Sequence, residues 1–72
     1  AFSPAMQLFV NGDPLELPDD DARVVTLIER MQLTGKRLAV EVNGHIVTRS
    51  AHAETRLQPG DRVEIVQAIG GG

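Results

Sequence analysis

The sequence ends in three consecutive glycines, Gly70, Gly71 and Gly72, which directly follow a hydrophobic segment with the pattern of a strand. Glycine makes up about 7% of an average protein, so three glycines at one chosen place arise by chance on the order of once in three thousand. Because glycine has no Cβ, these residues can extend through a channel too narrow for a side chain. We therefore expect residues 68–72 to form a flexible tail that presents the Gly72 carboxylate to a partner; the alternative is an ordinary frayed terminus.

The composition argues against several other kinds of chemistry. The 72 residues include no cysteine, which excludes disulfides, thiolate metal sites and cysteine nucleophiles. The net charge is -3 and only two residues are aromatic, so we expect no nucleic-acid partner. No apolar run is long enough to span a membrane and no segment resembles a signal peptide, so we expect no membrane partner and a cytoplasmic location.

The histidines and acidic residues do not form a recognisable catalytic or metal-binding pattern. His45 is next to a turn signal and His52 is in a polar segment, and no serine–histidine–acid arrangement is apparent. Asp19, Asp20 and Asp21 precede an apolar periodic segment, so we interpret them as the N-terminal cap of a helix rather than a cation site. We expect no metal site, no bound cofactor and no catalytic residue in this chain.

Hydrophobic periodicity predicts five short strands and one main helix. Asn-Gly pairs at residues 11–12 and 43–44 mark tight hairpin turns. The predicted strands span residues 6–10, 15–17, 38–42, 45–47 and 62–67, and the predicted helix spans residues 24–31.

Several residues mark the expected boundaries of these elements. Pro14 is expected in the first turn or at the first position of the returning strand, because it cannot donate a ladder hydrogen bond. Thr34-Gly35 is expected to end the main helix, and a short helical piece is expected around residues 50–53. We interpret residues 1–5 as a cloning remnant or a disordered segment, residues 6–67 as one folded domain and residues 68–72 as the tail.

The strands alternate between an inner and an outer face. The predicted helix-facing residues are Leu8, Val10, Leu38, Val40, Val42, Val63 and Ile65. The outer face then carries Phe9, Ala39 and Val66, flanked by Arg62 and Glu64. With Ile69, these six residues form a predicted partner surface in which Phe9 and Val66 are neighbours on adjacent strands. The alternative is a set of scattered exposed hydrophobic residues, which is common on protein surfaces.

Three blocks of sequence resemble a known family. They are MQLFVNG at residues 6–12, AVEVNGHIVTRS at residues 39–50 and LQPGDRVEIVQAIGGG at residues 57–72. Together they are similar to the ThiS family of sulfur carriers of thiamine biosynthesis, which have the ubiquitin-like β-grasp fold. The sequence departs from the family pattern at Thr48, where members often have proline, and at Gly70, which precedes the usual pair of glycines.

The resemblance implies a fold, a reaction and a set of partners. It implies an α+β fold, in which a mixed sheet of about five strands packs on one main helix. Gly71 and Gly72 match the family's functional diglycine. An E1-like adenylyltransferase (ThiF-like) would use ATP to adenylate Gly72, and a sulfur donor such as a cysteine desulfurase would convert it to a thiocarboxylate. The thiocarboxylate would donate sulfur to a thiazole synthase (ThiG-like), so the chain would be a protein co-substrate and not an enzyme.

Three other functions remain open from the sequence. A molybdopterin-synthase-type sulfur carrier would share the fold and the tail but have a different sulfur acceptor. A ubiquitin-like protein modifier would be joined through Gly72 to a lysine of its target. A non-covalent β-grasp adaptor would have the same fold and make no use of its terminal glycines.

Overall fold

The structure, a computed structural model, describes residues 4–67. These residues form one five-stranded sheet, one α-helix and two short 3-10 helices. In chain order the elements are β1 (Ala5–Val10), β2 (Asp13–Pro18), η1 (Asp19–Asp21), α1 (Val24–Arg30), β3 (Leu38–Val42), β4 (His45–Val47), η2 (Arg49–Ala51) and β5 (Arg62–Gln67). The predicted α+β class is confirmed, and β3, β4 and β5 have the predicted boundaries.

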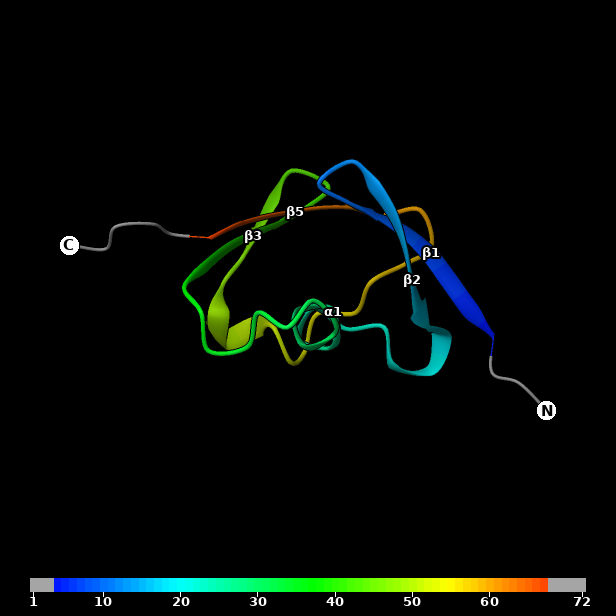
Figure 1. The fold of residues 1–72 in the computed structure, drawn as a ribbon, viewed down its shortest axis with the longest axis horizontal. Coiled ribbons are helices and arrows are strands. Elements are labelled where there is room, and N and C mark those ends of the chain that lie inside the picture. Colours follow the sequence, from blue (N-terminus) through cyan, green and yellow to red (C-terminus); the bar gives the residue numbers. More distant parts are fainter. Residues whose placement is uncertain (1–3, 68–72) are drawn as a thin grey trace.

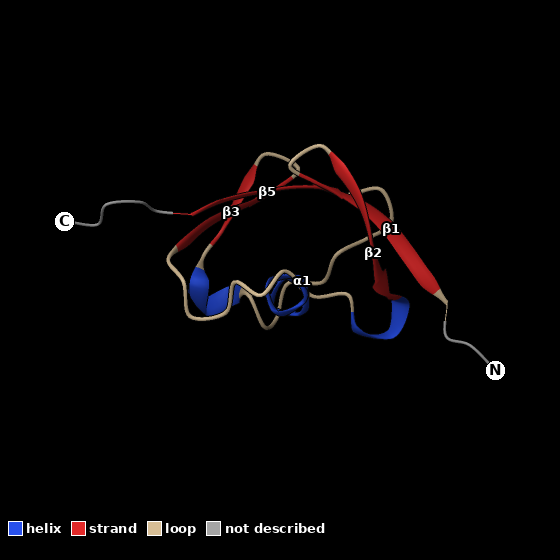
Figure 2. Ribbon diagram, viewed as in Figure 1, coloured by secondary structure: helices blue, strands red, loops and turns tan. Residues whose placement is uncertain are grey.

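The last strand, β5, lies at the centre of the sheet, whose strand order is β2-β1-β5-β3-β4. It runs parallel to β1, where Phe9 pairs with Arg62, and antiparallel to β3. The first and last strands of the chain are therefore parallel neighbours in the middle of the sheet. Figure 1 and Figure 2 show the curved sheet arching over α1, which lies beneath its concave face. This is the β-grasp arrangement.

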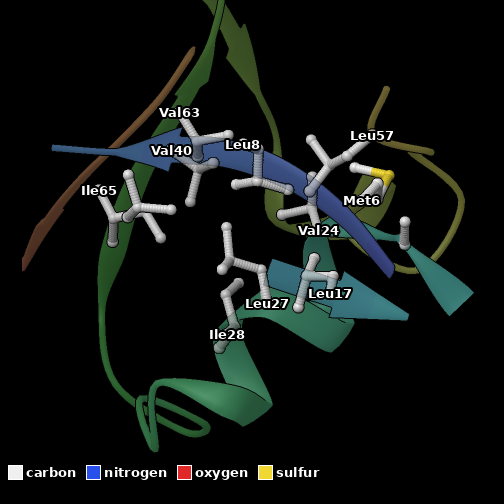
Figure 3. Close-up of a cluster of buried hydrophobic side chains, with 12 residues drawn as sticks. Met6, Leu8, Leu17, Val24, Leu27, Ile28, Val40, Leu57, Val63 and Ile65 are labelled. Atoms are coloured by element: carbon white, nitrogen blue, oxygen red, sulfur yellow. The ribbon is translucent and has the colours of Figure 1, made fainter. Parts of the chain in front are cut away.

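The core fills the space between α1 and the concave face of the sheet (Figure 3). Leu27 of α1 and Leu8 of β1 are both 0% exposed, and burial of each such side chain contributes about 1.5–3 kcal/mol. All of the residues predicted to face the helix belong to the core or are partly buried against it, which confirms the prediction: Leu8, Val10, Leu38, Val40, Val42, Val63 and Ile65.

The end of α1 differs from the prediction. The helix ends at Arg30, four positions before Thr34-Gly35, in a pair of reverse hydrogen bonds. The amide of Gln32 donates to the Glu29 carbonyl, and the amide of Leu33 donates to the Ile28 carbonyl, both at 3.0 Å. This is a Schellman motif, in which the residue after the cap is left-handed. Gln32 occupies that position with φ 61°, where glycine is the usual residue.

The three aspartates do not cap α1, so that prediction was wrong. They form η1, and the residue that precedes α1 is Arg23, whose side chain makes no cap hydrogen bond. The chain must stay extended between η1 and α1, because Ala22 is buried and Arg23 forms a β-bridge with Arg56. The sequence pattern placed the acidic run close to the helix but contained no sign of this bridge.

Three further boundaries differ by one or a few residues. β1 begins at Ala5 instead of Met6, because Ala5 pairs with Pro18 at the end of β2. Pro14 lies second in β2, opposite Phe9, and not in the turn or at the first position. β2 is an edge strand, so the missing amide of a proline is tolerated there. The short helical piece, η2, begins one residue earlier than expected.

Candidate functional site

The predicted reactive segment adjoins β5. Gly70, Gly71, Gly72 and the predicted contact residue Ile69 lie outside the described residues. The structure describes the strand that precedes them. β5 is paired with β3 up to its last residue, where Val66 pairs with Ala39 and Gln67 with Leu38. The sheet thus fixes the position of residue 67, which is the last described residue before the predicted tail.

On its other edge, β5 is hydrogen-bonded to the side chain of Asn11. β1 pairs with β5 only at Arg62 and Val63, because β1 then turns away at Asn11. The Asn11 amide group continues the ladder: its Nδ2 donates to the Ile65 carbonyl at 3.2 Å, and its Oδ1 accepts from the Ile65 amide at 2.9 Å. Asn11 therefore satisfies both backbone groups of a residue 54 positions away. The Asn-Gly pair predicts only a turn at Asn11, and no local pattern in the sequence indicates this second role.

A second asparagine supports the start of β5. Asn43 Oδ1 accepts from the Arg62 amide at 2.9 Å, and Asn43 Nδ2 donates to the Asp61 carboxylate at 3.0 Å. The backbone amide of Asn43 also donates to the Arg62 carbonyl at 2.7 Å. Both Asn-Gly turns therefore position β5, one at its start and one near its middle.

Part of the predicted partner surface gathers around a shallow hollow on the outer sheet face. Phe9, Arg62 and Glu64 line this hollow of about 620 Å³, together with Asn11 and Gly12. Phe9 is 37% exposed, so its ring is available at the surface. Three of the six predicted surface residues thus lie together, next to Asn11, whose side chain is hydrogen-bonded to β5.

The predicted contact between Phe9 and Val66 is wrong. Phe9 pairs with Arg62 at the start of β5, whereas Val66 lies four residues further on and pairs with Ala39. At about 3.3 Å per residue, the two side chains are separated by roughly 13 Å along the strand. The outer face therefore has two apolar regions, one at Phe9 and one at Ala39 and Val66.

A pair of like charges lies between these two apolar regions. Glu41 of β3 pairs directly with Glu64 of β5 on the outer face, and neither makes an ion pair within the described residues. Like charges directly opposite each other destabilise a sheet. Ile46, which pairs with Glu41 from β4, is 78% exposed. Glu41 and Ile46 thus belong to this face, although sequence reasoning left them out of the partner surface.

Residues 4–67 contain neither a cluster of metal ligands nor a membrane-spanning helix. Among residues 4–67, no group of three or more histidine, cysteine, aspartate or glutamate side chains is arranged to hold a metal ion. The only α-helix described in this part of the chain is too short to cross a membrane.

Known proteins resemble this chain over nearly its whole length. A model of the ThiS family matches residues 5–72. The crystal structure of the thiamine biosynthesis protein ThiS from Geobacter metallireducens is similar, with a TM-score of 0.76 and 32% sequence identity. That match covers 93% of this chain and 100% of the other. A thiazole synthase from Paramagnetospirillum magneticum is 34% identical over 67 residues, which is 93% of this chain, and the chain spans 20% of the length of that relative.

Proposed function

Because the chain belongs to the ThiS family, we propose that it is a sulfur carrier of thiamine biosynthesis and that Gly72 carries the sulfur. The observation that carries this proposal is the extent of the family match, which runs from residue 5 through Gly72 and so includes the terminal glycines. The similarity to a ThiS of known structure over 93% of this chain supports the same function. In this role the chain is a protein co-substrate, and the catalytic groups belong to its partners.

The chemistry of Gly72 explains why such a carrier needs an activating enzyme. The α-carboxylate is ionised at neutral pH and is a poor electrophile, because it has no good leaving group. On an E1-like adenylyltransferase, a carboxylate oxygen attacks the α-phosphorus of ATP and pyrophosphate leaves. The product is an acyl-adenylate, and the terminal sulfur of a persulfide donor attacks its carbonyl carbon, so AMP leaves and an acyl disulfide forms. A second thiol then reduces the S–S bond of this acyl disulfide and releases the donor in a new disulfide. The resulting thiocarboxylate is a stronger nucleophile than the carboxylate.

The sulfur acceptor in this proposal is a thiazole synthase. The relative from Paramagnetospirillum magneticum is named a thiazole synthase, and this chain resembles one fifth of its length. A carrier-like segment within such a protein supports a direct association between the carrier and the synthase. Both this step and the ATP-dependent activation fit a cytoplasmic location.

In this proposal the partners bind the carrier through its folded domain. We assign the partner surface to the outer sheet face, with Phe9, Arg62 and Glu64 around the hollow and Ala39 and Val66 near the end of β5. Ile69, which lies outside the described residues, is assigned to the same surface from the sequence alone. Val66 is 63% exposed, and exposed apolar side chains near a reactive terminus are suitable contacts for a partner.

Intact mass spectrometry tests the proposal directly. The protein is incubated with its E1-like adenylyltransferase, ATP and a sulfur donor, and its mass is expected to increase by the difference between sulfur and oxygen at Gly72. A variant that lacks Gly72 but keeps residues 1–71 is the matched control and is expected to remain unchanged. A variant with one extra, uncleaved residue after Gly72 should also fail, and thiazole formation by that variant would refute the proposal.

The same experiment, together with a binding assay and a test of auxotroph rescue, distinguishes the other functions. Covalent addition of a whole target protein would identify a modifier. An unchanged mass, with partners still binding a variant that lacks Gly71 and Gly72, would identify a non-covalent adaptor. Rescue of a molybdenum-cofactor auxotroph instead of a thiamine auxotroph would identify a molybdopterin-type carrier.

A further inference from the structure

A second hollow, of about 490 Å³, lies on the other side of the sheet from the partner surface, between the end of α1, the start of β3 and η2. Its floor is apolar and includes Ile28, Leu33 and Leu38, which pack on the core. Its rim carries Lys36, Arg37 and Arg49. We call this feature the basic hollow.

The basic hollow concentrates positive charge in an acidic protein. Three of the seven lysine and arginine residues lie on its rim, although the net charge of the chain is -3. Lys36, Arg37 and Arg49 are exposed and make no ion pair within the described residues. A cluster of unpaired cations around an apolar floor is complementary to a ligand that combines carboxylates with an apolar side chain.

One wall of the basic hollow contains a polar atom without a partner. His52 lines the hollow, and its Nε2 is buried and makes no hydrogen bond within the described part of the chain. Buried polar atoms are normally satisfied, so an exception calls for a structural explanation. His52 is therefore a lining residue whose buried Nε2 is not satisfied by the described protein atoms.

The exposure of the cations favours a protein segment over a small molecule as the occupant. Sites for small molecules enclose most of the ligand and hold it with a few well-positioned polar groups. Here no polar or charged residue among those described is fully buried, and the rim cations are on long exposed side chains. Such side chains suit the edge of a protein interface, where charges guide and orient the approach of a partner.

The basic hollow is also close to the point where β5 ends. Leu38 lines the hollow and pairs with Gln67, the last residue of β5. The five residues after Gln67 can span at most about 18 Å, so a partner that acts on Gly72 must come near this end of the sheet. We propose that the basic hollow binds an acidic segment of the enzyme that activates Gly72, as a second contact in addition to the outer sheet face; this inference rests on the proposed carrier function.

Charge-neutralising variants test this inference. The double variant Arg37→Gln and Arg49→Gln removes two rim cations, and the double variant Arg30→Gln and Arg56→Gln removes two cations elsewhere as a matched control. The probe is the E1-like adenylyltransferase of the same organism, and the measurement is its Kd for each variant over a range of salt concentrations. Equal melting temperatures establish that all proteins are folded.

The inference predicts about tenfold weaker binding for the rim variant at low salt, with a smaller difference at high salt, and less than a twofold change for the control. At saturating enzyme the rim variant should still form the thiocarboxylate, because docking and not chemistry is impaired. Chemical-shift changes on binding are expected in the amides of residues 33–38 and 49–53.

Several results would overturn the inference. Equal affinities for the rim variant and the control, with the thiocarboxylate still formed, would refute the basic hollow alone and leave the carrier function intact. Saturable binding of citrate or inorganic phosphate in the hollow below about 1 mM would indicate a small-molecule site instead. Failure of the wild-type protein to form the thiocarboxylate would refute the carrier function and this inference together.

Discussion

Two hairpin turns of this protein have the same two residues and nearly the same backbone, yet they support β5 in different ways. The Asn-Gly turns at residues 11–12 and 43–44 place their asparagines at φ 51° and 52°. The Asn11 side chain makes part-buried hydrogen bonds to both backbone groups of Ile65. The hydrogen bonds of Asn43 are exposed and reach only to the start of β5 and the loop before it. The same Asn-Gly pair therefore makes different contacts in the two turns, because different parts of β5 lie next to each turn.

Gln32 extends this comparison to a third position. Among the described residues, Asn11, Asn43 and Gln32 are the non-glycine residues with positive φ. The two asparagines offset the cost of the left-handed backbone with side-chain hydrogen bonds, whereas Gln32 makes none within the described residues. Replacement by glycine removes the side chain and keeps the backbone favourable, so it separates the two contributions.

The largest effect is expected for Asn11→Gly. Glycine adopts the turn without strain, so the variant loses mainly the two hydrogen bonds to Ile65, and we expect a loss of about 2 kcal/mol in unfolding free energy. Urea unfolding measures this loss, and hydrogen exchange at the Ile65 amide should become faster. The matched control is Asn43→Gly, which loses exposed hydrogen bonds and should cost less than about 1 kcal/mol. Equal losses in the two variants would mean that the hydrogen bonds to Ile65 stabilise the fold no more than the exposed hydrogen bonds of Asn43 do.

The opposite sign is expected for Gln32→Gly. This variant relieves a left-handed residue at the end of α1 and should raise the unfolding free energy by about 0.5–1 kcal/mol. The control is Glu29→Gly within α1, where the greater flexibility of glycine should cost about 1 kcal/mol. Calorimetric melting of both variants provides the measurement, and a lower melting temperature for Gln32→Gly would contradict the interpretation of strain.

These three positions also illustrate how much of the fold the sequence could predict. The Asn-Gly pairs located both hairpin turns, and the alternation in β3 and β5 assigned the inner face without an error. Local patterns repeat within a few residues, so they can be recognised in a single chain. The bond from Asn11 to Ile65 spans 54 positions and leaves no local pattern, which is why the sequence analysis missed it.

The errors in the candidate site have the same origin. Phe9 and Val66 were assigned correctly to the outer face, but the stagger of parallel strands depends on how β1 and β5 pair, which alternation does not encode. The same applies to Ile46, whose short strand gave no clear alternation. The capping prediction for the aspartates failed because Ala22 and Arg23 are held extended by tertiary contacts.

A smaller stabilising effect is expected for Glu64→Gln. Glu64 lies on β5 between the residues that Asn43 and Asn11 contact. The change removes the like-charge pair with Glu41 and should raise the unfolding free energy by about 0.5 kcal/mol at low salt, with less effect at high salt. The control is Glu16→Gln, because Glu16 pairs with the neutral Gln7. Chemical unfolding at two salt concentrations measures the difference. A gain that does not depend on salt would show that charge repulsion is not its cause.

The last contrast is between the neutral hydrogen bonds of Asn11 and the charged ones of Asp21. Asp21 Oδ1 accepts from Arg23 Nε at 2.8 Å and from Thr26 Oγ1 at 3.0 Å, and these hydrogen bonds, that of Arg23 first, hold the pKa of Asp21 below its ordinary value. A carboxylate whose pKa is lower in the folded state stabilises the protein above its unfolded pKa, and this contribution disappears as the pH falls through the folded pKa.

The stability difference between wild type and Asp21→Asn should therefore shrink when urea midpoints are compared from neutral pH to below about pH 4. The difference between wild type and Asn11→Gly should stay constant over the same range, because its hydrogen bonds do not involve a titrating group. A constant difference for Asp21→Asn as well would show that the pair with Arg23, whose side chain is 43% exposed, is too well solvated to contribute.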